Sequence, residues 1–126
     1  MPVVRISGLP QGAGVDLTRT LQRLCVELAQ LDGVDARHWW ATWQPIDPAS
    51  YVEGDTPAPA EQPTSTHPPI VEVLGFRGRD PELVERLLAA SVEIVADGLR
   101  VDPGNVFAFW TELAPGRVST GGQIRW

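Results

Sequence analysis

The feature that most constrains this chain is an internal repeat with an offset of 67 residues. Two short β-prone segments, one led by Pro2 and one by Pro69, carry similar residues at matching places. Each is followed by a helical pattern and then by a β-rich run that ends with a tryptophan beside a threonine. The chain therefore reads as one β-α-β unit written twice. The matched pairs are Pro2 with Pro69, Val3 with Ile70, Val4 with Val71, Ile6 with Val73, and Gly8 with Gly75.

Two β-α-β units in tandem predict an α/β (α+β) fold in a single domain, residues 1–126. Parallel β-α-β crossovers are right-handed, so both helices should lie on the same face of a four-stranded sheet. The expected strands are 3–7, 37–44, 70–74 and 106–112. The other face of the sheet needs a cover, and a closed ring of identical chains would supply it.

Both helices carry start and stop signals in the sequence. Asp16 is the expected N-cap of the first helix and Gly33 its stop, while Asp80-Pro81-Glu82 starts the second helix and Gly98 ends it. Leucines recur at helical spacing in the first helix and predict one buried face. These are Leu17, Leu21, Leu24, Leu28 and Leu31.

Three tryptophans fall within the expected strand 37–44. Alternation along a strand places Trp39 and Trp43 on one face and Trp40 on the other. We interpret the second face as a contact with another subunit, the alternative being that all three are core aromatics of one chain.

The segments outside the repeats differ in composition. Repeat 1 spans 2–44 and repeat 2 spans 69–122, separated by an insertion, 45–68, that holds six of the twelve prolines. The insertion reads as a linker or long loop. A lid over a pocket is conceivable, but the composition favours mobility, with His67 in contact with solvent. The tail 117–126 is too polar for a core.

Composition excludes several functions. A net charge of −6 argues against nucleic acid as a partner. All ten basic residues are arginines, which excludes Schiff-base lysine chemistry and the lysine of a phosphate-binding loop. The single Cys25 is expected to be a buried small hydrophobe, and no metal cluster has recognisable spacing. Neither a membrane span nor a secretion signal is evident, so we expect a cytoplasmic protein.

Two residues are candidates for chemistry on their own properties. Removal of Met1 would leave Pro2 with a secondary amine, and an α-amino group titrates nearer neutrality than lysine does. Burial and nearby arginines would lower the pKa of that amine, which would make it a competent general base. Arg79 lies at a strand-to-helix junction, where it could bind a carboxylate in two hydrogen bonds or simply be solvated.

The order of motifs resembles a known superfamily. From Pro69 to Gly122, the proline-led strand, Gly78-Arg79, the run from Val106 to Thr111-Glu112 and Gly121-Gly122 resemble 4-oxalocrotonate tautomerase. In the first half, His38-Trp39 and Thr42-Trp43-Gln44 resemble 5-carboxymethyl-2-hydroxymuconate isomerase. The whole layout is also similar to the macrophage migration inhibitory factor family. About 100 residues are covered, the insertion being left out.

This resemblance implies a homotrimeric isomerase that acts on a small unsaturated keto or hydroxy acid without cofactor or metal. Pro2 matches the catalytic base, and Arg79 matches the arginine that binds a substrate carboxylate. Val118 matches an apolar residue lining the pocket, with Arg117 beside it. Phe107 stands where the family has a second arginine, and the matching place in the first half is His38 with Arg37 next to it. Arg37 or His38 is therefore the expected electrophile.

Two alternatives stay open at this point. A protonated Pro2 could serve a hydratase, dehalogenase or decarboxylase of the same fold. A retained Met1 would make the nitrogen of Pro2 an amide, and the protein would then be a trimer that binds a ligand or a partner without catalysis.

Overall fold

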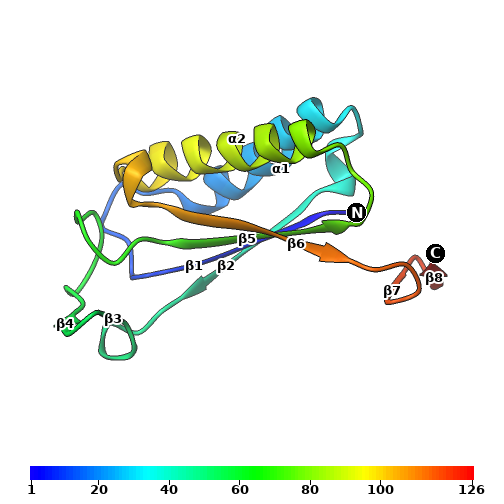
Figure 1. Ribbon diagram of the computed structural model, residues 1–126. Helices are drawn as coiled ribbons and strands as arrows, with labels where there is room; N and C mark the ends of the chain where they lie inside the picture. Colours follow the sequence, from blue (N-terminus) through cyan, green and yellow to red (C-terminus); the bar gives the residue numbers. More distant parts are fainter.

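The computed structural model describes all 126 residues. A sheet of four strands carries both long helices on one face, as Figure 1 shows, which confirms the predicted architecture. The elements in chain order are β1 (Val3–Gly8), α1 (Leu17–Asp32), β2 (Trp40–Pro45), β3 (Val52–Glu53), β4 (Thr56–Pro57), β5 (Ile70–Phe76), α2 (Pro81–Leu99), β6 (Phe107–Leu113), β7 (Val118–Thr120) and β8 (Gln123–Arg125).

The sheet order is β2-β1-β5-β6, with parallel pairing inside each repeat and antiparallel pairing of β1 with β5 at the centre. The repeats are therefore related by an approximate two-fold axis between β1 and β5. Equivalent residues lie 67 positions apart throughout, including two short 3₁₀ turns, Ala36–His38 and Pro103–Asn105. The sequence offset is thus a structural offset as well.

The core lies between the sheet and the helices. Val4 and Ile6 of β1 and Val71 and Val73 of β5 alternate toward the helices, where they are buried. Leu24 and Leu28 pack from α1, and Leu87, Ile94 and Val95 from α2. Two expectations for α1 need qualification: Leu31 is exposed, and Cys25 is only half-buried, although burial raises the pKa of its thiol.

Helix ends follow the predicted signals with one exception. The carboxylates of Asp16 and Asp80 accept hydrogen bonds from Arg19 N and Glu82 N, and Gly33 ends α1 in the left-handed conformation. The prediction that Gly98 ends α2 is wrong, because the helix continues to Leu99 and Arg100 takes the left-handed position. A glycine is used at 98 because a Cβ there would collide with Thr20 of α1.

A glycine and a tryptophan pack together in both repeats. A Cβ on Gly8 would lie 2.8 Å from the ring of Trp43, and one on Gly75 would collide with the benzene edge of the Trp110 indole. Trp43 and Trp110 are equivalent residues on β2 and β6. The repeated glycines are therefore required by close approach of an indole rather than by a turn.

β2 begins later than predicted. Strand pairing starts at Trp40, because residues 36–38 form a 3₁₀ turn capped by Asp35. The predicted facing is nonetheless confirmed: Trp39 is buried and Trp43 packs against the core, while Trp40 is 48 % exposed on the other face.

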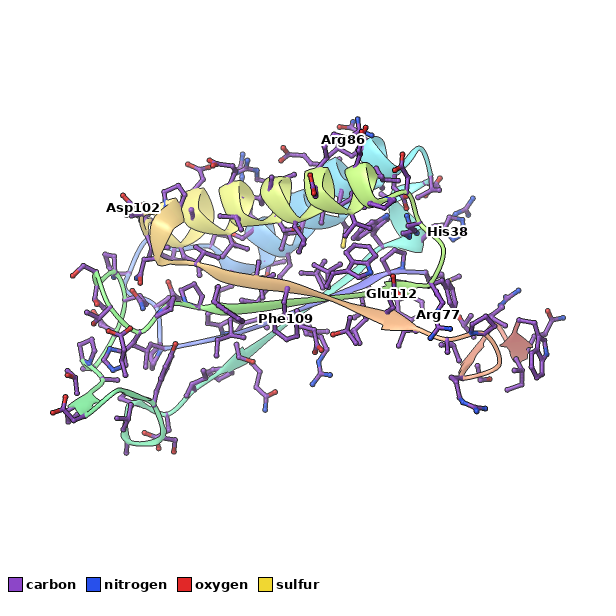
Figure 2. All side chains as sticks on the ribbon, in the orientation of Figure 1. His38, Arg77, Arg86, Asp102, Phe109 and Glu112 are labelled. Atoms are coloured by element: carbon purple, nitrogen blue, oxygen red, sulfur yellow. The ribbon has the colours of Figure 1, made fainter.

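The face of the sheet away from the helices is rich in exposed aromatic residues. Phe107 and Phe109 lie there with their ring centroids 5.8 Å apart, and Figure 2 shows Phe109 pointing away from the helices. Glu72 accepts a hydrogen bond from Thr111 and pairs with Arg5 on the same face. This face is uncovered in a single chain.

The insertion 45–68 is ordered, and the expectation that His67 contacts solvent is wrong. His67 has no exposed surface; its Nε2 lies 3.0 Å from the carbonyl oxygen of Thr56 and its Nδ1 lies 2.9 Å from Thr66 Oγ1. Gln62 is also buried and donates to the carbonyl oxygen of His67, while its own backbone pairs with that of Pro10 and Gly12. Buried polar groups that are hydrogen-bonded in this way fix the insertion against the body of the protein.

The tail forms a short hairpin, β7–β8. Gly121 and Gly122 both have positive φ and make the two-residue turn between the strands, which is the geometry that favours glycine. Figure 1 shows the hairpin projecting past the end of β6, whereas β3 and β4 lie at the opposite end of the sheet. Neither long helix has the length and apolarity needed to span a membrane.

Candidate active site

The amino end of the chain is held at one end of the central strand pair. Pro2 is buried, and its carbonyl oxygen accepts a hydrogen bond of 3.1 Å from Trp40 N. The equivalent bond of repeat 2, from Phe107 N to Pro69 O, is 3.0 Å long. The fold therefore fixes both prolines in the same way, but only Pro2 is next to the chain's amino terminus.

A buried ion pair lies beside this end. Arg79, between β5 and α2, donates through Nη1 to Oδ1 of Asp32, the last residue of α1. The second oxygen of Asp32 accepts a hydrogen bond of 3.1 Å from Trp39 Nε1. The side chain of Asp32 is 5 % exposed and that of Arg79 is 20 % exposed, so both charges are largely removed from water. The guanidinium of Arg79 also lies over the ring of Trp110, 5.9 Å from its centroid.

The amino group of Met1 lies close enough to this ion pair to feel the charges of both Arg79 and Asp32. Burial lowers the pKa of that group from its usual value of 8.0, and Arg79 lowers it further, while Asp32 raises it and Arg125 lowers it. Thr120 of β7 is in contact with Met1, its Oγ1 lying 3.7 Å from the sulfur. The amino end is thus half-enclosed by charged groups and by the tail.

The other end of the sheet lacks this cluster. By the offset of 67, Leu99 occupies the place of Asp32, and Gly12 that of Arg79. Leu99 belongs to the core, and the ordered insertion packs at that end. The charged cluster therefore breaks the symmetry of the repeats, and it does so at the end where the amino terminus lies.

Comparison with known proteins gives structural matches only. No model of a protein family matches the chain, and neither does any curated protein. A symmetric trimer of wild-type fused 4-OT, Q0, superposes with a TM-score of 0.82 at 17 % identity, covering 98 % of this chain and 94 % of that one. Pt0534 inactivated by 2-oxo-3-pentynoate superposes at 0.84 with 15 % identity and the same coverage, 98 % and 94 %. FG41 malonate semialdehyde decarboxylase inhibited by 3-bromopropiolate gives 0.70 at 23 % identity, covering 94 % and 88 %.

The chain has the tautomerase fold. The resemblance noted in the sequence is confirmed at this level, since the matches span nearly the whole chain, including the insertion and the tail.

The residues predicted for this tautomerase-fold site fall into two groups. Pro2 and Arg79 lie at the same end of the sheet, and Val118 lies on β7, on the same strand face as Thr120. His38 lies at this end too, in the 3₁₀ turn before β2 (Figure 2). Arg37 is different: its side chain is 80 % exposed and pairs with Asp35 at 3.6 Å. Arg117 is exposed and precedes β7.

Several residues of the site were not found from the sequence. Asp32 pairs with Arg79 and accepts a hydrogen bond from Trp39, Trp110 lies under the guanidinium of Arg79, and Thr120 and Arg125 approach Met1. The repeat held a signal for Asp32, because the equivalent residue of the second helix is the apolar Leu99. No group of three or more His, Cys, Asp or Glu side chains is placed to bind a metal ion.

Proposed function

We propose that this protein is a tautomerase, an isomerase of a small unsaturated 2-keto or 2-hydroxy acid, with Pro2 as the general base after removal of Met1. The observation that carries this proposal is the position of the amino end. The fold holds it half-buried beside Arg79 and Asp32, in surroundings that lower the pKa of the Met1 amine, and we expect the same direction for the amine of Pro2 once Met1 is removed. An amine that is neutral near pH 7 can accept a proton.

The proposed reaction needs only the chain's own groups. The neutral nitrogen of Pro2 takes the proton of an enol O–H, whose electron pair becomes the C=O bond. The electrons of the enol double bond shift along the conjugated system to a carbon atom, which receives the proton back from the Pro2 ammonium. Arg79, which the resemblance makes the carboxylate ligand, lies beside the amine, and Val118 would line the approach with Arg117 next to it in the sequence. His38 or Arg37 would polarise the oxygen where negative charge develops; the geometry favours His38, since Arg37 is paired with Asp35.

We further propose that the site is completed in a homotrimer. The hollows of the single chain lie along α1 and α2, and none is lined by Met1, Pro2, Asp32 or Arg79. A neighbouring chain would give the amino end a second wall and would cover the aromatic sheet face. The trimeric state of the similar fused 4-OT structure supports this arrangement. The cytoplasmic location and independence from cofactors stay predictions from the sequence.

The decisive test is the state of the amino terminus together with turnover. Intact mass of the protein from its own host should show loss of Met1, and the processed protein should convert phenylenolpyruvate to phenylpyruvate. The same chain carrying additional amino-terminal residues, in which the nitrogen of Pro2 is an amide, should lose roughly 10²- to 10⁴-fold in kcat. A native chain that retains Met1 and does not turn over the probe would replace this proposal by a non-catalytic binding role.

One observation favours a second candidate function. Asp32 is an anion close enough to raise the pKa of the amine, and a protonated Pro2 would act as an acid in a hydratase, dehalogenase or decarboxylase. The similarity to a malonate semialdehyde decarboxylase is consistent with this alternative. The pH profile separates the two, because activity that depends on the neutral amine rises with pH and activity that depends on the ammonium falls.

A further inference from the structure

The arginines around the amino end differ in whether a carboxylate pairs with them. Arg79 and Asp32 form one buried pair whose net charge is zero. Two other arginines near this end are also paired, Arg37 with Asp35 at 3.6 Å and Arg77 with Glu112 at 3.7 Å. Figure 2 shows Arg77 and Glu112 together at the end of β6. A carboxylate ligand that relied on Arg79 would have to compete with Asp32, whose second oxygen is held by Trp39.

Arg125 is the cation near Met1 that no carboxylate neutralises. In the β7–β8 hairpin, Val118 pairs with Arg125 and Thr120 pairs with Gln123. Directly opposed residues of an antiparallel pair point to the same face, and residues two apart on a strand share that face. Arg125 therefore lies on the face of the hairpin whose Thr120 contacts Met1. It forms no ion pair, and its effect on the amine is a further sign of proximity.

The hairpin holds Arg125 in place by its backbone. Gly116 N donates a hydrogen bond of 2.7 Å to the carbonyl oxygen of Arg125. The guanidinium lies over the turn, because a Cβ on Gly121 would be 3.1 Å from Nη2 of Arg125. Because the backbone of Arg125 is fixed in the strand, only the freedom of its exposed side chain is lost when it binds a ligand.

We propose that Arg125 is the residue that binds the carboxylate of the substrate, and that the site takes a small acid with one carboxylate. Asp32 keeps Arg79 as a neutralised part of the wall, and Arg125 is the one cation on the hairpin face that contacts Met1, so a second carboxylate finds no other unpaired cation on that face. This inference rests on the proposed function in one respect: it assumes that a small carboxylate binds at the same site. It assigns the substrate class, a monocarboxylic rather than a dicarboxylic acid, and it makes Arg125 the specificity-determining residue.

The test is a binding measurement that needs no turnover. Crotonate and fumarate have the same carbon skeleton with one and two carboxylates, and their dissociation constants are measured by titration calorimetry on the full chain. The wild type should bind crotonate more tightly than fumarate. Arg125→Gln should weaken crotonate binding about ten- to a hundredfold, the range for one charge-assisted hydrogen bond. Arg125→Lys, which keeps the charge, should restore part of the loss.

The matched control is Arg86→Gln, which removes the same charge elsewhere. Arg86 is exposed on the outer surface of α2, as Figure 2 shows, and its loss should leave crotonate binding unchanged. Absence of crotonate binding in the wild type, or equal affinities in wild type and Arg125→Gln, would overturn the inference. A tighter wild-type binding of fumarate than of crotonate would overturn the assigned substrate class.

A second variant tests the role given to Asp32. Asp32→Asn frees the guanidinium of Arg79, so fumarate binding should tighten about tenfold relative to crotonate; an unchanged preference would overturn that role. Turnover of phenylenolpyruvate is measured in parallel on the processed protein. Arg125-dependent crotonate binding without turnover would leave this inference standing while the proposed function fails. Turnover of phenylenolpyruvate together with crotonate binding that does not depend on Arg125 would leave the proposed function standing while this inference fails.

Discussion

At the scale of single residues, the contact between Gly75 and Trp110 links stability to the site. Gly75→Ala should lower the free energy of unfolding by about 1–3 kcal/mol, the usual cost of overpacking a core, because the new methyl group meets the indole ring. Urea unfolding measures this difference. The double variant Gly75→Ala/Trp110→Leu should cost less than the sum of its two single changes. Strict additivity would contradict the proposed contact.

If the protein is the proposed tautomerase, the charges near the amine set the pH dependence of its activity. If Pro2 is the base, kcat/KM rises with pH through the pKa of its amine and then levels off. Burial and Arg79 lower the pKa of the Met1 amine, and we expect the same direction for the amine of Pro2 after Met1 is removed, so the rise should lie below the pKa of an exposed amino-terminal proline. Asp32→Asn removes the anion that opposes this effect, and the rise should move to lower pH. Arg79→Gln should move it to higher pH.

The measurement is the pH profile of kcat/KM for the processed wild type and both variants. Asp16→Asn, at the opposite end of α1, is the control and should leave the midpoint unchanged. Shifts of Asp32→Asn and Arg79→Gln in the same direction would contradict the charge arrangement. A profile that falls through this pH range in the wild type would support the protonated Pro2 instead.

The sequence was informative about some site residues and silent on others for a physical reason. Pro2 and Arg79 could be found because their positions follow directly from the ends of predicted elements. Arg125 could not, and Asp32 could be noticed only as a departure from the repeat, since their contacts depend on which segments meet in space. The pairing of Asp32 with Arg79 joins residues 47 positions apart, and the contact of Thr120 with Met1 spans 119 positions. No local pattern encodes such separations.

At the scale of elements, we predict that the insertion 45–68 is rigid because its buried polar side chains are hydrogen-bonded. His67 and Gln62 are buried and hydrogen-bonded, so His67→Ala should leave a cavity and unpaired polar groups and should destabilise the segment by about 2–4 kcal/mol. Limited proteolysis with mass spectrometry should find the wild-type insertion resistant and the variant cleaved within it. Ser65→Ala, at an exposed position, is the control. Equal cleavage of wild type and His67→Ala would contradict the structural role of this histidine.

Element boundaries departed from the predictions wherever tertiary contacts overrode local signals. The pattern of 37–44 has strand character, but Asp35 caps a 3₁₀ turn there and β2 starts at Trp40. Gly98 looks like a helix stop, yet it serves the close approach of α2 to Thr20. The proline-rich composition of the insertion suggested mobility, but the insertion is ordered. Its buried Gln62 and His67 form hydrogen bonds with backbone groups that only the folded loop presents.

At the scale of the whole molecule, a nearly symmetric scaffold carries an asymmetric site. The repeats agree in strand pairing, in 3₁₀ turns and in the glycine–tryptophan contact. They differ where Asp32 stands in place of Leu99, and where the insertion packs at the end opposite Met1. Repeat 1 therefore supplies the amino terminus and Asp32, whereas the second half of the chain supplies Arg79 and the hairpin that contacts Met1. Duplication predicted the fold, whereas these departures from the repeat locate the site.

The proposed trimer would cover the free face of the sheet. Phe107 is 55 % exposed and lies beside Phe109 on the face away from the helices, where apolar surface would be removed from water in a trimer. Light scattering coupled to size exclusion should give three times the mass of one chain for the wild type. Phe107→Asp should yield monomers, because three buried carboxylates would each need a partner, and Arg5, the arginine of this face, already pairs with Glu72.

The matched control for this prediction is Val52→Asp. Val52 is 57 % exposed but lies on β3 in the insertion, away from the sheet face, so the same change there should leave the trimer intact. The monomeric Phe107→Asp chain should keep its helical circular dichroism, since Phe107 is outside the core, and should lose turnover because the amino end loses its second wall. A wild-type monomer with full activity would contradict the shared site, and a Phe107→Asp trimer would place the interface elsewhere.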